Sequence, residues 1–154
     1  SLKWVKSVNL STNLKNKIKL EIYEYKPIGI YSLNTQMFYF SEEGQIIDQF
    51  KGEMIDNFIL FFGKQSLSNA KNFLYILNKI QQFELLNIKE AHYINERRWN
   101  IKLENEISVF LSEKDIESSL RNYIKLISKL KDSEIVSIQS IDLRNNEKAI
   151  IKLK

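Results

Sequence analysis

The chain has 154 residues, 44% of them hydrophobic and 27% charged, and it carries a formal net charge of +4. This length suits one domain, or one domain with part of a second, and the hydrophobic share excludes a disordered tail. The absence of cysteine excludes disulfide scaffolds, cysteine-bound zinc and thiol catalysis. The basic residues are spread along the chain rather than clustered among aromatic residues, which argues against a nucleic-acid partner.

The N-terminal segment has the features of neither a signal peptide nor a membrane span. Residues 1–6 lack an apolar signal core. The longest apolar cluster, residues 58–62, is far shorter than the ~18 residues that cross a bilayer. Because the chain also starts without methionine, we expect a fragment of a longer protein.

The first 27 residues are predicted to contain a β-hairpin. Residues 5–10 alternate weakly between apolar and polar side chains, and residues 18–25 alternate almost strictly. Strict alternation is typical of a half-buried strand. Pro27 should end the second strand, because proline donates no ladder hydrogen bond.

A second hairpin is predicted between residues 37–40 and residues 45–47. The intervening turn contains Gly44, which can adopt the left-handed backbone conformation that such a turn needs. The apolar residues 55–63 are expected to connect this hairpin to the next element.

Two amphipathic helices are predicted farther along the chain. Apolar side chains recur with helical spacing over residues 66–83, where Ser66 or Ser68 is the expected N-cap, and over residues 115–131. The remaining predicted strands are residues 91–94, 98–103, 107–111, 135–143 and 148–153. The predicted fold class is therefore α+β, an antiparallel β-sheet domain with two amphipathic helices.

The sequence offers little catalytic or metal-binding chemistry. His92 is the only histidine, and without a nucleophile motif or metal-ligand partners it is expected on the surface or on an edge strand. The carboxylate pairs, Glu42 with Glu43 and Glu104 with Glu106, fall on predicted turns, where we expect ordinary pKa values and no acid–base role. We expect no catalytic site, no cofactor and no metal.

A cationic cluster, Arg97 and Arg98 followed by Trp99, precedes one predicted strand. Such a cluster is compatible with a cation–π or nucleic-acid contact. It is more typical of the start of a strand, with the tryptophan in the core and the arginines paired to glutamate.

Four motifs follow one another along the chain: WVKSV with IKLEIYEYKPI (residues 4–8 and 18–28), FSEEGQI (residues 40–46), RWNIKLENEI (residues 98–107) and IDLR (residues 141–144). The first resembles the end of a POTRA domain. In this order, and spanning nearly the whole chain, the four together resemble the extracytoplasmic part of the FtsQ/DivIB family of bacterial cell-division proteins.

Two positions depart from the pattern of that family. Glu106 stands where the family prefers glycine after asparagine, so this turn is not expected to be an ideal Asn-Gly type I′ turn. Asn145 takes the place of the family's common tyrosine after the arginine. The family's cytoplasmic tail, transmembrane helix and first POTRA elements have no counterpart in this sequence.

The resemblance implies that residues 1–27 are the C-terminal remnant of a POTRA domain and that residues 28–154 are an FtsQ-type β domain. It implies a non-enzymatic scaffold of the cell-division machinery, the divisome. A single membrane helix upstream of this chain would anchor it in the inner membrane, with this region in the periplasm at the septum. The implied partners are the coiled-coil proteins FtsB and FtsL and, through them, the septal peptidoglycan synthase.

The resemblance also implies that the C-terminal strand receives a strand from FtsB. Independently, a terminal strand with one unpaired row of backbone groups favours strand addition. Arg144 would then bind a partner carboxylate, but the strand could instead lie inside the sheet and Arg144 could pair with Asp142 or Glu147. The predicted partner-binding residues are Arg144, Glu147, Lys148, Ala149, Ile150, Ile151, Lys152 and Leu153.

Three other functions stay open at this point. A POTRA-type module of another envelope assembly machine is one, although such modules normally repeat and this chain shows no repeat. A cell-wall enzyme would need a strongly perturbed carboxylate in a deep cleft. An RNA-binding domain would need aromatic residues exposed together on one sheet face among lysines.

Overall fold

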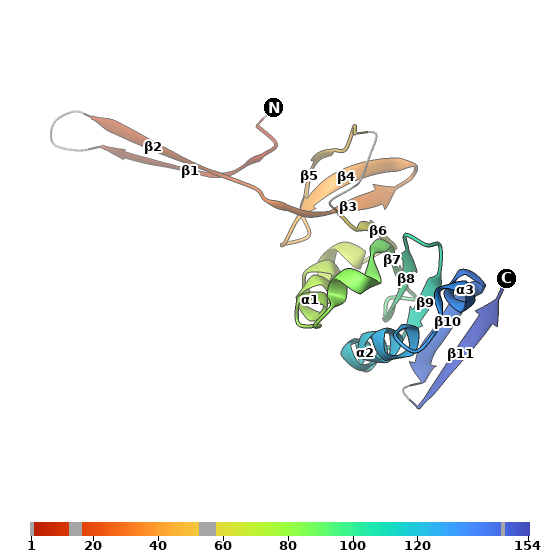
Figure 1. The fold of residues 1–154 in the computed structure, drawn as a ribbon. Coiled ribbons are helices and arrows are strands. Elements are labelled where there is room, and N and C mark those ends of the chain that lie inside the picture. The colour runs from red at the N-terminus through yellow and green to blue at the C-terminus, as the bar shows by residue number, and fades with distance from the viewer. Residues whose placement is uncertain (1, 13–16, 53–57, 146) are drawn as a thin grey trace.

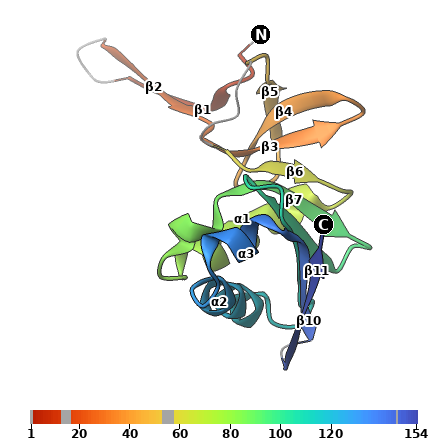
Figure 2. The same ribbon diagram turned by 45° about the vertical axis from the view of Figure 1, so that its right-hand side comes forward.

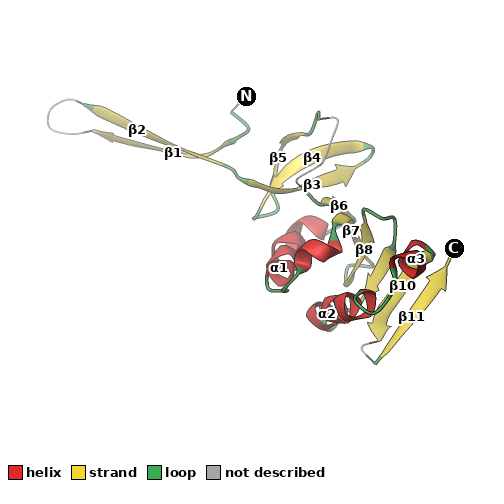
Figure 3. Cartoon of the chain, viewed as in Figure 1, coloured by secondary structure: helices red, strands yellow, loops and turns green. Residues whose placement is uncertain are grey.

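The computed structural model describes residues 2–12, 17–52, 58–145 and 147–154, which form a two-stranded sheet, a nine-stranded sheet and three α-helices (Figures 1 and 3). The strands are β1 (Val5–Thr12), β2 (Ile18–Glu24), β3 (Pro27–Leu33), β4 (Gln36–Ser41), β5 (Ile46–Gln49), β6 (Leu60–Phe62), β7 (Ile88–Ile94), β8 (Arg98–Leu103), β9 (Ser108–Leu111), β10 (Ile138–Asn145) and β11 (Lys148–Leu153). The helices are α1 (Ser66–Asn78), α2 (Ile116–Ile127) and α3 (Asp132–Val136), with a short 3-10 helix, η1, at Phe83–Leu86.

The large sheet has the strand order β11-β10-β9-β8-β7-β6-β3-β4-β5. Most neighbours are antiparallel, but β3 with β6, β6 with β7, and β9 with β10 are parallel. Two of these parallel pairs follow from crossovers, through α1 between β6 and β7 and through α2 and α3 between β9 and β10. The predicted α+β class is confirmed, and the sheet is mixed rather than wholly antiparallel.

The helices α1 and α2 cover one face of this sheet (Figures 1 and 2). One row of side chains in register across β7 to β10 is at most 1% exposed and points to the helices: Ala91, Ile101, Val109 and Ile141. The neighbouring row is partly exposed on the opposite face: His92, Asn100, Phe110 and Asp142. Since side chains alternate along a strand, this register assigns every strand residue to one of the two faces.

The core is built around a cluster of aromatic rings. Phe61 of β6 is fully buried and contacts three rings edge-on. Its ring centroid lies 5.4 Å from that of Phe40, 6.4 Å from that of Phe73 and 5.7 Å from that of Trp99. Because these residues come from β4, β6, α1 and β8, one cluster joins the sheet to its first helix.

The predicted N-terminal hairpin is confirmed as β1 and β2, which project away from the rest of the molecule (Figure 1). The strands were expected to be half-buried, but cross-strand pairs such as Val8 with Ile22 and Leu10 with Leu20 place apolar residues on one uncovered face. The exposed fractions are 50% for Val8, 67% for Leu10, 70% for Ile18, 56% for Leu20 and 55% for Ile22.

The base of this hairpin is attached to β4, β5 and the turn between them. The contacts are an ion pair of Lys3 with Asp48 at 2.7 Å, an ion pair of Lys6 with Glu43, a hydrogen bond from Tyr25 to Gln45 at 2.7 Å, and a ring contact of Trp4 with Tyr39 at 5.5 Å between centroids.

The second predicted hairpin is confirmed as β4 and β5, with Gly44 at a φ of 77°. Two strands were not predicted. Pro27 does follow the end of β2, but it also begins β3, which turns into β4 through Asn34 and Thr35, both at positive φ. Part of the expected connection over residues 55–63 forms β6, while residues 55–57 lie outside the described residues.

The helix starts differ from the prediction in two places. The N-cap of α1 is Gln65, at a φ of 71°, rather than a serine, and Ser66 is the first helical residue, whose buried Oγ caps no N–H among the described residues. The second predicted helix, residues 115–131, ends at Ile127 as α2, and an unpredicted helix, α3, follows and includes the first two residues of an expected strand, Ile135 and Val136. Glu134 accounts for α3, because its carboxylate accepts the Lys131 N–H at 2.8 Å and so caps a new helix.

Candidate functional site

The C-terminal strand β11 is the outermost strand of the nine-stranded sheet (Figure 1). All six of its residues are exposed, including Ile150 at 66%, Ile151 at 38% and Leu153 at 59%. An exposed apolar edge strand is a template for pairing with another chain. The structure therefore brings the predicted residues of this strand together on one open edge.

The backbone direction shows which groups face that edge. The Lys154 N–H donates to the Ser137 carbonyl oxygen at 2.9 Å, so it points inward, toward β10. Successive N–H groups of a strand point to opposite sides, and the register is regular over Ile150, Ile151 and Lys152. It follows that the outward-pointing N–H groups are those of Ala149, Ile151 and Leu153.

The two faces of β11 differ in what they offer a partner. Ile151 pairs with Ile141, whose side chain points to the helices, so Ala149, Ile151 and Leu153 share the helix-covered face. Lys152 pairs with Ser140 and Ile150 with Asp142, on the face that the helices leave open. A strand added at this edge would thus meet different surfaces with its alternate side chains.

Arg144 lies near the end of β10. Of the two carboxylate partners that the sequence left open, Asp142 and Glu147, it pairs with Asp142. Its Nε donates to both carboxylate oxygens of Asp142 at 2.9 Å, and the ion pair holds the pKa of Asp142 below its usual range. The side chain of Arg144 is nevertheless 50% exposed. Since a guanidinium has five N–H donors, it keeps donors for a second carboxylate. Glu147 lies in the turn before β11, where its N–H donates to Asn145 Oδ1 at 2.9 Å.

A groove of about 470 Å³ lies beside Arg144 and is lined by Arg98, Ser112, Glu113, Lys114, Arg144 and Asn145. The sequence predicted for Arg98 either a pairing with glutamate or a cation–π or nucleic-acid contact. Its Nε is instead buried without a hydrogen-bond partner among the described residues. The guanidinium groups of Arg98 and Arg144 thus line one groove, although the two residues are 46 positions apart in sequence (144 minus 98).

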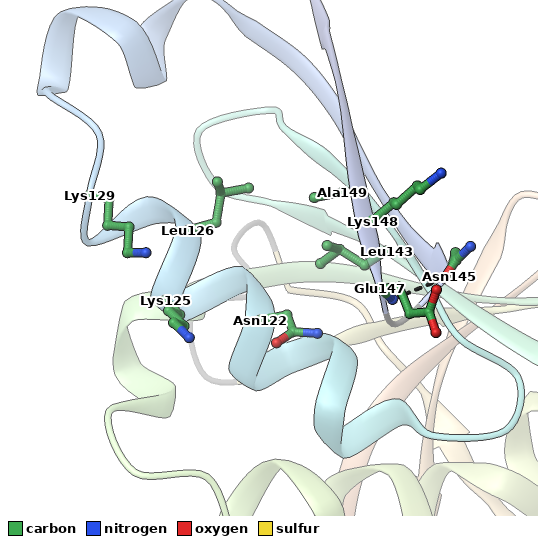
Figure 4. Close-up of a pocket in the computed structure, with 9 residues that line it drawn as sticks. All are labelled: Asn122, Lys125, Leu126, Lys129, Leu143, Asn145, Glu147, Lys148 and Ala149. Carbon is green, nitrogen blue, oxygen red and sulfur yellow. Dashed lines mark hydrogen bonds between the residues drawn. The ribbon is translucent and has the colours of Figure 1, made fainter.

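A second groove, of about 350 Å³, lies between α2 and the start of β11 (Figure 4). Asn122, Lys125, Leu126 and Lys129 line its helix side. The sheet side is formed by Leu143, Asn145, Glu147, Lys148 and Ala149. None of the α2 residues that line this groove was predicted from the sequence to bind a partner. Lys125 lies on α2 and Lys129 in the turn after it, and their spacing in the sequence does not show that either meets the terminal strand.

His92 lies on β7, an interior strand, so the edge-strand alternative is wrong. Its ring stacks on Phe62 at 4.4 Å between centroids, and its Nε2 lies 2.8 Å from the Glu90 carboxylate. The ring is on the sheet face away from the helices, where it is partly exposed. Among the described residues, no three His, Cys, Asp or Glu side chains gather to hold a metal ion.

The turn carboxylates do not all have ordinary pKa values, contrary to the prediction. A hydrogen bond from Lys6 lowers the pKa of Glu43 to about 2. Hydrogen bonds from Lys102 and Lys89 lower the pKa of Glu106 to about 2. Both groups stay ionised at neutral pH as fixed partners of lysines, which is the opposite of the raised pKa that a general acid needs.

The Arg97–Trp99 cluster fits the interpretation of a strand start. Trp99 is 2% exposed in the core, and Arg97 pairs with Glu113 at 3.5 Å. At the following turn, Glu106 has a φ of 68° while Asn105 does not share the left-handed region, so this is not a type I′ turn, as expected. Within the described ranges, no helix has the length and apolar character of a membrane span.

Comparisons with known proteins identify the family. The sequence profile described as "Cell division protein FtsQ/DivIB, C-terminal" matches residues 31–144. Cell division protein FtsQ of Rickettsia prowazekii is 30% identical over 151 residues, covering 97% of this chain and 55% of the relative. FtsQ of Bradyrhizobium diazoefficiens is 22% identical over 153 residues, covering 97% of this chain and 43% of the relative.

One solved structure is also similar, that of the major extracytoplasmic domain of the trans isomer of the cell division protein DivIB from Geobacillus stearothermophilus. It is 16% identical, with a TM-score of 0.48, and the match covers 70% of this chain and 95% of that chain. The chain spans about half the length of the Rickettsia relatives, 55% for each. Because the family profile matches most of the sequence, from β3 to the end of β10, the chain belongs to the FtsQ/DivIB family of cell division proteins.

Proposed function

We propose that this chain is a non-enzymatic scaffold of the divisome that binds FtsB, and with it FtsL, by strand addition to β11. The main support for this proposal is that β11 is the outermost strand of the sheet and has three outward-pointing N–H groups and exposed apolar side chains. Main-chain hydrogen bonds would supply affinity, and alternate side chains would supply specificity. Through these partners the protein would act on the septal peptidoglycan synthase.

Arg144 contributes a charged contact in this proposal. Arg144 keeps free donors and lines, together with Arg98, the groove of about 470 Å³ at the end of β10, where a partner carboxylate would be bound. Asp142 would stay in place as the group that orients the Arg144 guanidinium, since it already accepts from Nε. Membership of the FtsQ/DivIB family favours this scaffold over the alternatives of an unrelated POTRA module, a cell-wall enzyme and an RNA-binding domain.

The location follows the same reasoning. We propose that the complete protein is a single-pass inner-membrane protein and that this region lies in the periplasm at the division septum. The family membership supports a place in cell division, and the full-length relatives extend well beyond the part that this chain spans.

We further propose that β1 and β2 close a POTRA domain and that residues 28–154 form the β domain. The support is the apolar face of the hairpin, whose five apolar residues are between 50% and 70% exposed. A two-stranded hairpin is marginally stable in water on its own, so this face needs a covering layer. In the complete protein, the other POTRA elements would provide that layer.

The strand-addition proposal is tested by calorimetric titration with a synthetic peptide from the extracytoplasmic part of the FtsB of the same bacterium. We expect saturable binding to the natural chain and no measurable binding to Ile151→Pro, which loses an outward N–H while the ladder to β10 keeps its donors. Ile151→Val is the matched control, because it keeps the N–H and should bind normally. Circular dichroism checks that each variant is folded. Equal binding by Ile151→Pro would overturn the proposal.

A further inference from the structure

Three lysines without carboxylate partners among the described residues line the groove between α2 and β11: Lys125 and Lys129 on the helix side and Lys148 on the strand side. Lys125 is exposed on α2 and Lys129 is exposed in the turn after this helix ends at Ile127, and neither forms an ion pair within the described residues. These lysines outnumber the one carboxylate of the lining, that of Glu147, and therefore give this groove an excess of positive charge.

The groove also has an apolar part, and the side chain there on the terminal strand is small. Leu126 and the buried Leu143 form the apolar part, and Ala149 stands opposite the helix on the terminal strand (Figure 4). Ala149 is the smallest of the three β11 side chains on the helix-covered face, the others being Ile151 and Leu153. The groove thus extends over the edge strand at Ala149, where the small side chain leaves space for a side chain of the partner strand.

Glu147 is the carboxylate on the border of this groove. It lies in the turn before β11, on the strand side, and its side chain is directed away from Lys125 and Lys129 in Figure 4. It therefore leaves both lysines available to an incoming anion.

We infer that this groove binds an acidic side chain of the strand that adds to β11, a glutamate placed opposite Ala149. This inference rests on the proposed function, because the strand addition brings the partner to the groove. Directly opposite residues on neighbouring strands are about 5 Å apart at Cβ, so a glutamate there spans Ala149 toward α2. Its methylene groups would contact Leu126, and its carboxylate would reach Lys125 and Lys129.

This arrangement makes the groove a specificity element rather than the source of the main affinity. Charges at the border of an interface mainly change the association rate, its salt dependence and the choice of partner. We therefore expect Lys125→Glu combined with Lys129→Glu to weaken the FtsB peptide about fivefold to tenfold. The matched control is Lys51→Glu combined with Lys64→Glu, which changes the net charge equally at exposed positions away from the groove.

The decisive experiment is a double-mutant cycle in the same titration. Each acidic residue of the FtsB peptide is replaced in turn by its amide, and each peptide is titrated against the natural chain and the Lys125/Lys129 variant. One replacement should weaken binding to the natural chain about fivefold but not weaken binding to the variant, where the attraction is lost and the introduced glutamates repel the carboxylate.

The outcomes separate this inference from the proposed function. If the peptide binds and Ile151→Pro abolishes binding, but no acidic residue couples to the two lysines, the groove inference is wrong and the edge-strand proposal stands. If the control variant loses as much affinity as the Lys125/Lys129 variant, the effect is one of net charge and the inference is also wrong. If the peptide does not bind the natural chain, both fail together.

Discussion

The two terminal hairpins both hold apolar side chains in water, but they do so in different geometries. In β1 and β2, both strands expose one flat face, with Leu10 at 67% and Leu20 at 56% exposed. In β10 and β11, the inner strand is buried at Ile138, Ile141 and Leu143, whereas all six residues of the outer strand are exposed. An exposed apolar sheet face is buried when another layer packs on it, whereas an unpaired sheet edge is satisfied when another strand adds to it.

The chain therefore has two kinds of exposed apolar surface, an uncovered sheet face in β1 and β2 and an unpaired sheet edge at β11. The N-terminal hairpin also has few links to the large sheet, through its base alone, while β11 is continuous with a nine-stranded sheet. We therefore expect the C-terminal edge to be rigid before binding and the N-terminal face to depend on its covering for stability. Four variants test this difference.

The largest loss of stability is expected in the buried core, away from both hairpins. Phe61→Ala removes the ring at the centre of the aromatic cluster and should lower the free energy of unfolding by about 3–5 kcal/mol. Ile150→Ala, at 66% exposure on the edge strand, is the control and should cost about 0.5 kcal/mol or less. Denaturant unfolding measures both. A cost at Ile150 close to that at Phe61 would show that the edge is not free.

The second variant concerns the bare face. Leu10→Ser combined with Leu20→Ser should change the unfolding free energy of this chain by about 0.5 kcal/mol or less, because both side chains are already in water. In the complete protein, the same changes should cost about 2–3 kcal/mol, because the covering layer would then lose two buried leucines. Thermal unfolding of both lengths measures the difference. Equal small effects in both would contradict the POTRA assignment.

The third variant concerns the helix that borders the groove. Asp115 caps α2 by accepting the Ser118 N–H at 2.9 Å, so Asp115→Ala should cost about 1 kcal/mol. Asp115→Ser is the control, because serine also caps and should restore most of the loss. Unfolding in denaturant distinguishes the two, and an Asp115→Ala chain as stable as the natural one would show that α2 does not depend on this cap.

The smallest effect is the pH dependence of the ion pair beside the edge. Because Arg144 lowers the pKa of Asp142 in the folded chain, the pair stabilises the fold above the unfolded-state pKa of aspartate. This contribution is lost as the pH falls through the lower pKa of the folded state. Asp142→Asn should therefore cost about 0.5 kcal/mol at pH 7, since Arg144 is half exposed, and the cost should vanish in strong acid. A cost that is independent of pH would rule out the ion pair as its cause.

Sequence patterns predicted the strands that have one buried face, because alternation is visible there. β8, with Trp99, Ile101 and Leu103 buried and the residues between them half-buried, is the clearest case. β3 and β6 lack alternation, since they lie inside the sheet with consecutive buried residues such as Ile30 and Tyr31. Periodicity alone does not separate such short apolar runs from connections.

Only the part of the candidate site that lies in one continuous stretch of sequence, the C-terminal strand with the residues just before it, was predicted. The alternation of Lys148–Leu153 showed a strand, and its place at the end of the chain suggested an edge. The two grooves bring together residues that are far apart in sequence, such as Lys125 with Ala149, through the crossover from β9 to β10. A contact created by sheet order is not visible in any local pattern, so it needed the structure.

The most direct test of the central claim is amide hydrogen exchange of β11 measured by NMR, with and without saturating FtsB peptide. In the free chain, the outward N–H groups of Ala149, Ile151 and Leu153 should exchange fast, and those of Ile150 and Lys152 should be protected by β10. Peptide binding should protect the three outward groups as well. Saturable binding that leaves all three exchanging as fast as before would contradict strand addition at this edge.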